Sequence, residues 1–110
     1  MYSGGEHGPT AELITHVKPL FERYGVRVYL SGHDHDLQHI EMGSTHYLCT
    51  GAGSETRPTS MTTGSKFCSD RSGFTAARLD RDAMRFEFRD YAGAVLYRAS
   101  IPALKLASAA

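Results

Sequence analysis

The stretch VRVYLSGHDH, residues 26–35, says most about the fold of this 110-residue chain. Its first five residues form an apolar-rich run of the length that makes a buried β-strand. Gly32 follows, and His33 and His35 come directly after it. Neutral imidazole binds zinc, iron and manganese, and two imidazoles one residue apart at a strand end can face one metal centre. The alternative is a turn in which both histidines are solvated.

Residues 10–24 predict a helix that leads into this strand. Its apolar residues recur at helical spacing on one face: Leu13, Ile14, Val17, Leu20, Phe21 and Tyr24. Pro19 lacks a backbone donor, so we expect it to kink the helix or to begin a new turn. Gly25 is a typical helix stop. A helix that passes through a tight turn into a buried strand is half of an α/β layered unit.

The rest of the chain predicts strands. Five are expected, at residues 37–42, 47–50, 74–79, 84–89 and 94–101. The clearest is 84–89, where Met84, Phe86 and Phe88 alternate with charged residues, so that one face is wet. Residues 55–72 are rich in Ser, Thr and Gly without periodicity, which predicts a long surface loop. The expected fold class is α/β, with one helix followed by mostly antiparallel strands.

Length and charge exclude some classes of function. With 110 residues the chain is long enough for one domain with a modest core. Its 12 basic and 12 acidic residues give a formal net charge of zero. This argues against a nucleic-acid partner, because binding a polyanion requires a basic excess. No apolar run reaches the roughly 18–20 residues that cross a bilayer, so no membrane partner is expected.

A firmly held metal needs at least three protein ligands. Candidates for a third ligand beside the His-x-His pair are His7, His39, His46 and Glu41. The simpler expectation places His39 on the exposed face of a strand and His46 in a turn. His16 falls on the polar side of the helix and is expected to be solvated. The chain by itself therefore does not complete a coordination sphere.

Other chemistries fit these residues less well. A cupin-like site would use His33, His35 and Glu41, but the spacing to the glutamate is wrong and the second cupin motif is absent. No Gly-x-Ser-x-Gly segment is present, which disfavours a serine hydrolase. Asp34 is expected to be a surface turn carboxylate, while Asp36 could orient an imidazole as a hydrogen-bond acceptor.

The two cysteines, Cys49 and Cys68, permit one disulfide but do not require it. Cys49 lies in an apolar run and is expected to be a small core residue, whereas Cys68 lies in the predicted loop. A bond between them would close a loop of about twenty residues and would restrict the unfolded chain. Both possibilities stay open at the level of sequence.

Several blocks in order resemble the purple acid phosphatases, and within them the small tartrate-resistant acid phosphatase type, which are calcineurin-like metallophosphoesterases. The blocks are YSGGEHGPT at 2–10, LFERYGV at 20–26, YLSGHDHDLQ at 29–38, TGAGS at 50–54 and SGF at 72–74. The resemblance implies that residues 1–103 are the C-terminal part of a four-layer α/β/β/α metallophosphoesterase sandwich. Residues 104–110 are expected to be a tail.

The resemblance also implies a chemistry, the hydrolysis of phosphate monoesters by a metal-activated water. It implies a dinuclear metal centre of iron plus iron, zinc or manganese. His33 would bind the second, divalent metal, and His35 would bind the first metal, which is ferric iron in purple members. His7 would lie beside the substrate phosphate as a substrate-binding and catalytic residue that protonates the leaving group.

The chain departs from the family in its metal ligands. The family's other ligand segments are an aspartate, Gly-Asp-x-x-Tyr, Gly-Asn-His and a histidine just before the Tyr-Ser loop, and none occurs here. We therefore expect a fragment of a longer enzyme, with an incomplete centre, that is inactive and prone to aggregate by itself. The alternatives are a phosphodiesterase of the same superfamily, or a non-catalytic β-rich binding remnant.

The partners follow from the same resemblance. It implies a small-molecule phosphate ester or a phosphoprotein as substrate, and a secreted, periplasmic or lysosomal parent enzyme. Three cations in or near the predicted loop, Arg57, Lys66 and Arg71, could contact a phosphate group or could simply be solvated.

Overall fold

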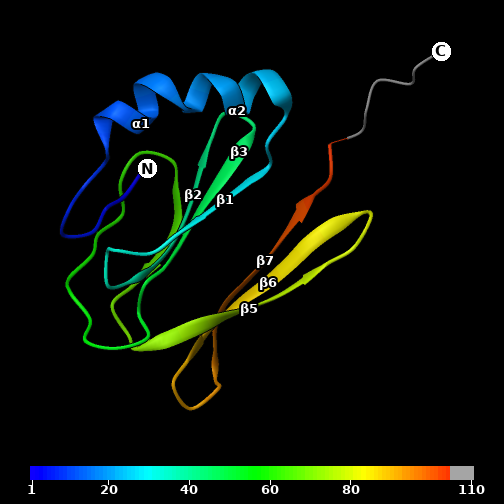
Figure 1. Ribbon diagram of the computed structural model, residues 1–110. Coiled ribbons are helices and arrows are strands. Elements are labelled where there is room, and N and C mark those ends of the chain that lie inside the picture. Colours follow the sequence, from blue (N-terminus) through cyan, green and yellow to red (C-terminus); the bar gives the residue numbers. More distant parts are fainter. Residues whose placement is uncertain (105–110) are drawn as a thin grey trace.

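Two short helices cover one face of a four-stranded sheet, and a three-stranded sheet packs against the other face (Figure 1). The structure is a computed structural model and describes residues 1–104, so the predicted tail lies outside the described residues except for Leu104. The expectation of an α/β fold in which mostly antiparallel strands follow a helical segment is confirmed.

The predicted helix is formed as two consecutive helices, α1 (Ala11–His16) and α2 (Lys18–Tyr24), which meet at Val17. Pro19 lies in the first turn of α2, where its missing N–H would have no partner within the helix. The expected effect of Pro19 is therefore confirmed as a new helix start. Gly25 ends α2 with φ 67° and ψ 36°, a left-handed conformation that favours glycine.

The four-stranded sheet has the order β1-β3-β2-β4. Its strands are β1 (Val28–Ser31), β2 (Leu37–Met42), β3 (Thr45–Thr50) and β4 (Ser65–Ser69). β1 is parallel to β3, while β2 is antiparallel to both of its neighbours. The prediction of a continuous loop at 55–72 is wrong, because β4 forms there by pairing with β2. The polar composition of β4 gives no strand pattern, and only the pairing with β2 reveals it.

The three-stranded sheet is an antiparallel meander of β5 (Gly73–Leu79), β6 (Ala83–Asp90) and β7 (Val95–Pro102). The predicted alternation in β6 is confirmed, since Met84, Phe86 and Phe88 are buried while Arg85 is exposed. All three predicted strands of the final third are therefore present.

The apolar core has two parts, one on each face of the four-stranded sheet. The part between the two sheets contains Leu37, Leu48, Ala52, Met84, Phe86, Phe88 and Ile101. The part beneath the helices contains Met1, Ile40 and Tyr47, against which apolar helix residues pack. β2 and β3 contribute to both parts because successive side chains of a strand point to opposite faces.

Other apolar side chains remain open to solvent. Leu30 in the edge strand β1 is 59% exposed, and neither α1 nor α2 has a fully buried residue. Neither helix in residues 1–104 has the length and apolar character needed to cross a membrane.

The two cysteines are both free thiols. Cys49 in β3 and Cys68 in β4 are both in register with Gln38, on opposite sides of β2. Their Cα atoms are thus about 10 Å apart, two interstrand spacings, which is too far for a disulfide. The expectation that Cys49 is a buried core residue is confirmed.

Candidate functional site

The candidate site lies at the edge where β1 and β3 end. Because these strands are parallel, the loop at 32–36 and Gly51 emerge at the same edge of the sheet. The Gly51 N–H donates to the Asp36 carbonyl oxygen at 3.0 Å, which ties the two connections together. A Cβ atom on Gly51 would overlap the Asp34 carbonyl oxygen, so this close approach requires glycine.

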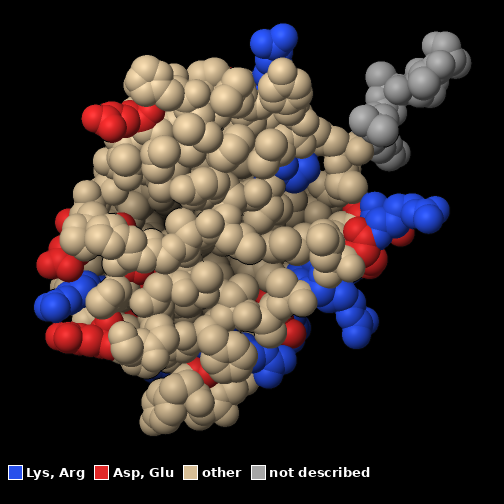
Figure 2. All heavy atoms as spheres, viewed as in Figure 1, with Lys and Arg blue, Asp and Glu red and all other residues tan. Residues whose placement is uncertain are grey.

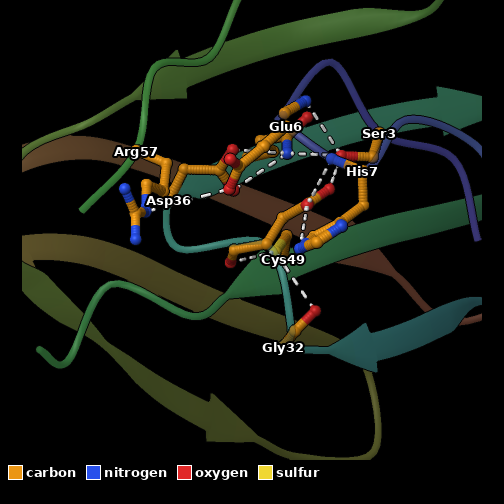
Figure 3. Close-up of polar contacts among 10 residues, drawn as sticks. Ser3, Glu6, His7, Gly32, Asp36, Cys49 and Arg57 are labelled. Atoms are coloured by element: carbon orange, nitrogen blue, oxygen red, sulfur yellow. Dashed lines mark hydrogen bonds and ion pairs between the residues drawn. The ribbon is translucent and has the colours of Figure 1, made fainter. Parts of the chain in front are cut away.

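Asp34 joins this edge to the loop at residues 1–9, from which Ser3 and His7 are labelled in Figure 3. Its carboxylate accepts hydrogen bonds from the Ser3 hydroxyl and, at 2.9 Å, from the His7 backbone N–H. Asp34 is only 5% exposed, so the prediction of a surface turn carboxylate is wrong. The sequence could not show this burial, since it depends on a loop far away in the chain folding over Asp34.

Gln38 completes the support beneath the loop at residues 1–9, and sequence analysis missed it. Its amide nitrogen donates to the Ser3 hydroxyl oxygen at 2.9 Å and to both carboxylate oxygens of Asp36 at 2.9 and 3.0 Å. Its amide oxygen accepts the Gly4 N–H at 2.7 Å. Asp36 is buried against this amide and makes no hydrogen bond to an imidazole of residues 1–104, so the suggested imidazole-orienting role is not seen.

His7 and His33 are brought together by this arrangement. Their rings stack with centroids 4.0 Å apart and planes at 21°. His33 has φ 75°, a left-handed conformation that is uncommon for residues other than glycine. The Asp34 carboxylate also lies 4.0 Å from His7 Nε2. The site thus holds two exposed imidazoles from two different loops, and the backbone of His33 is strained, as is frequent at functional sites.

His35 is half-buried, unlike the exposed His33. Its Nδ1 atom is buried and has no hydrogen-bond partner among the described residues. Its carbonyl oxygen accepts the Arg57 N–H at 3.0 Å, which fixes the backbone. A buried ring nitrogen without a partner fits a metal ligand, because buried polar atoms are otherwise hydrogen-bonded.

The described residues do not complete a metal site. Within residues 1–104, no group of three or more His, Cys, Asp or Glu side chains converges in a way that could hold a metal ion. His33 and His35 therefore fit part of a metal centre but do not form one alone.

A cavity of about 280 Å³ opens beside this loop. His7, His33 and Asp34 line it together with Tyr29 and Cys49. Burial, reinforced by the Asp36 carboxylate, raises the pKa of the Cys49 thiol to about 12. In the chain without metal, Cys49 is therefore a neutral thiol at the wall of the cavity.

Of the three cations singled out in the sequence, Arg57 lies closest to this loop. Its side chain pairs with Glu6 at 3.8 Å and with Glu55 at 3.5 Å (Figure 3). Lys66 pairs with Glu41, and Arg71 pairs with Asp90. On the face shown in Figure 2, basic and acidic side chains lie near one another around the rim.

Two histidines were placed wrongly by the sequence. His39, predicted on a strand surface, is 3% exposed, and His46, predicted in a turn, lies in β3 and is 6% exposed. The reason is that β2 and β3 each have a strand on both sides and a packed layer on each face, so polar residues of these strands are covered as well. Neither histidine joins the site at the loop.

Comparison with known proteins agrees with this geometry. The chain superimposes on the solved structure of GAP50, described as the anchor in the inner membrane complex of Plasmodium, with a TM-score of 0.89. The match covers 96% of this chain and 35% of that chain, at 27% identity. This fold, with a His-x-His loop at the end of β1, is that of the C-terminal part of a calcineurin-like metallophosphoesterase sandwich.

Similarity to curated proteins narrows the class. The chain is 34% identical to purple acid phosphatase 7 of Arabidopsis thaliana over 108 residues, which are 90% of this chain and 32% of that protein. It is 32% identical to tartrate-resistant acid phosphatase type 5 of Rattus norvegicus over 113 residues, which are 93% of this chain and 35% of that protein. No protein-family model matches. The chain belongs to the purple acid phosphatase family and spans about a third of the length of these relatives.

Proposed function

We propose that this chain supplies part of the active site of a metal-dependent acid phosphatase that hydrolyses phosphate monoesters. The observation that carries the proposal is the stacking of His7 on His33 beside buried Asp34, in a cavity at the carboxyl ends of two parallel strands. The names of the relatives, which are acid phosphatases, support the same reaction.

His33 and His35 would hold part of a dinuclear centre of iron with iron, zinc or manganese. When bound, such a centre supplies a water of lowered pKa and neutralises charge on the phosphoryl oxygens. The unpaired Nδ1 atom of His35 and the exposed imidazole of His33 fit this role. Two imidazoles leave most coordination positions to water, so we expect the isolated chain to bind metal weakly and to be inactive.

His7 is the proposed proton donor to the leaving group. Its backbone is fixed by the hydrogen bond to Asp34, and its ring borders the cavity. As an imidazolium it can give a proton to an alcohol oxygen within hydrogen-bond reach. Asp34, which also accepts a hydrogen bond from the Ser3 hydroxyl, positions His7.

The substrate is proposed to be a small phosphate ester or a phosphoprotein, and the active protein is proposed to be secreted, periplasmic or lysosomal. A phosphodiesterase is an alternative, because the same kind of metal centre serves both reactions. Arg57, whose backbone N–H donates to the His35 carbonyl oxygen, is a proposed contact for an anion.

A second candidate is a non-catalytic binding protein. It is favoured by the similarity to GAP50, which is described as an anchor. In this case the fold would serve as a surface and the His-x-His loop would carry no metal.

The two candidates are separated by adding Co²⁺ to the ¹⁵N-labelled chain and recording imidazole NMR signals. The phosphatase proposal expects paramagnetic broadening at His7, His33 and His35, with exposed His16 unaffected. The variant His33→Ala/His35→Ala should lose the effect. Broadening that is equal at His16, or that persists in the double variant, would favour the non-catalytic candidate.

The expected inactivity is tested separately with p-nitrophenyl phosphate and added Fe³⁺, Zn²⁺ or Mn²⁺. Turnover by the isolated chain above that of His33→Ala/His35→Ala would contradict it. Light scattering of the same samples tests the expected aggregation, for which exposed Leu30 on the open edge of β1 is the structural reason.

A further inference from the structure

A chain of hydrogen bonds away from the candidate site connects the two sheets. The Tyr97 hydroxyl of β7 lies 2.9 Å from His39 Nδ1 in β2. His39 Nε2 lies 2.8 Å from His46 Nδ1 in β3, and His46 Nε2 lies 3.0 Å from a carboxylate oxygen of Glu41. Both imidazoles are therefore engaged at both nitrogens.

The two imidazoles lie in the core between the sheets. Their rings stack with centroids 5.1 Å apart, and the His39 ring meets Phe86 of β6 edge-on at 5.2 Å. His39 also packs against the Tyr97 ring. The pair thus forms the polar part of an otherwise apolar contact between the sheets.

The chemistry of the end groups fixes where the protons are. The Glu41 carboxylate only accepts, so His46 Nε2 carries a proton and His46 Nδ1 is an acceptor. His39 Nε2 must then donate to His46 Nδ1, which leaves His39 Nδ1 to accept the Tyr97 hydroxyl proton. When both imidazoles are neutral, this is the one arrangement of protons that allows all three hydrogen bonds from Tyr97 through His39 and His46 to Glu41.

We propose that His39 and His46 form a pH-sensitive latch between the two sheets, which is closed while both imidazoles are neutral and is released by acid. A proton added to either imidazole would place a positive charge in the apolar contact between the sheets, where the His39 ring meets Phe86. The hydrogen bonds would then require the Tyr97 hydroxyl to accept a proton instead of donating its own, so the arrangement of the neutral pair is lost.

The charges around the pair do not favour an added proton. Glu41 attracts one, but its side chain is 40% exposed and its charge is screened by solvent. Arg27, next to β1, and Lys66, on β4, both oppose a positive charge on His46, and Lys66 also opposes one on His39. Burial is the largest effect, and it lowers the pKa of His39 from 6.5 to about 4 and also lowers the pKa of His46.

The direction of the pH effect follows from these shifts. In the unfolded chain the imidazoles take up protons near pH 6.5, whereas the folded chain keeps His39 neutral to about pH 4. The stabilisation is complete above pH 6.5 and is lost progressively as the pH falls toward 4. For His39 alone, the folding equilibrium constant should fall about 30-fold between pH 7.5 and pH 5, and His46 adds to this fall.

Urea unfolding of the 110-residue chain at pH 7.5 and pH 5 tests the latch. The wild-type chain should lose stability on acidification by at least this factor. His39→Gln/His46→Gln, whose amides do not titrate, should lose much less, and the matched control His16→Gln should behave as the wild type. A wild-type chain that is no better folded at pH 7.5 than at pH 5, or a double variant with an unchanged pH dependence, would overturn the proposal.

A measurement on the unmodified chain covers the case in which the double variant fails to fold. Two-dimensional ¹H–¹⁵N spectra of the imidazole rings at pH 8 should show a proton on Nε2 and none on Nδ1 in both residues. The His39 ring should stay neutral when the pH is lowered to 5.5, and the His46 ring should take up its proton below pH 6.5. A proton on Nδ1 of either residue at pH 8, titration of His39 between pH 6 and 7, or titration of His46 at or above pH 6.5 would refute the latch.

Discussion

Two stacked pairs of imidazoles occupy opposite environments in this chain. His7 and His33 stack at the open edge of the four-stranded sheet, with centroids 4.0 Å apart. His39 and His46 stack at 5.1 Å inside the core between the sheets. The exposed pair is held by its backbone and keeps its ring nitrogens free of hydrogen bonds from the described residues. The buried pair uses all four ring nitrogens in contacts with other residues. Histidine is thus available for binding or proton transfer at the sheet edge, whereas in the core it links the two sheets.

Removal of one buried imidazole should give the largest effect. His39→Leu leaves the Tyr97 hydroxyl and His46 Nδ1 without partners, and we expect a loss of about 3 kcal/mol in the free energy of unfolding. Urea unfolding at pH 8 measures it. The control His16→Ala, at an exposed helix position, should change stability by less than about 0.5 kcal/mol. Equal losses in the two variants would show that the buried pair is not part of the core.

Removal of the support beneath the exposed pair should have an intermediate effect. Asp34→Ala deletes the acceptor for Ser3 and for the His7 backbone, and we expect a loss of about 2 kcal/mol together with release of His7 from His33. Nuclear Overhauser contacts between the two rings should disappear. Asp70→Ala, at an exposed carboxylate, is the matched control. Persistence of the ring contacts in Asp34→Ala would mean that the rings stack without this carboxylate.

The smallest expected effect on stability comes from the strained backbone of His33, one member of the exposed pair. His33→Gly relieves the positive φ angle, whereas His33→Ala keeps a Cβ atom there. We expect the glycine variant to be more stable than the alanine variant by about 1 kcal/mol. Thermal unfolding compares them directly. Equal melting temperatures would contradict the assignment of strain to His33 and would remove one sign of a functional loop.

The parts of the fold that could be predicted are those with a local pattern. The alternation in β6 and the end of the helix at Gly25 can each be recognised from a few consecutive residues, and both predictions are confirmed. β4 could not be predicted, because its polar sequence becomes a strand only through pairing with β2. The burial of His39 and Asp34 was missed for the same reason, since distant segments cover them.

The site was predictable in part. His33, His35 and His7 were singled out by their motifs, and the structure brings His7 onto His33, but the roles of these residues remain proposals. Gln38 and Asp34 were not assigned to the support of His7. No local pattern marks a buried amide or carboxylate, because its partners come from a loop thirty or so residues upstream.

The sequence by itself determined the elements whose residues carry their own signal: the helical periodicity before Gly25, the strands of the final third and the Gly-His-x-His loop. Only the tertiary structure decided which histidines are exposed and which are buried, and which carboxylates are covered. The physical reason is that periodicity arises from contacts between near neighbours in the chain. Burial and hydrogen-bond direction arise from contacts between segments that the sequence does not pair.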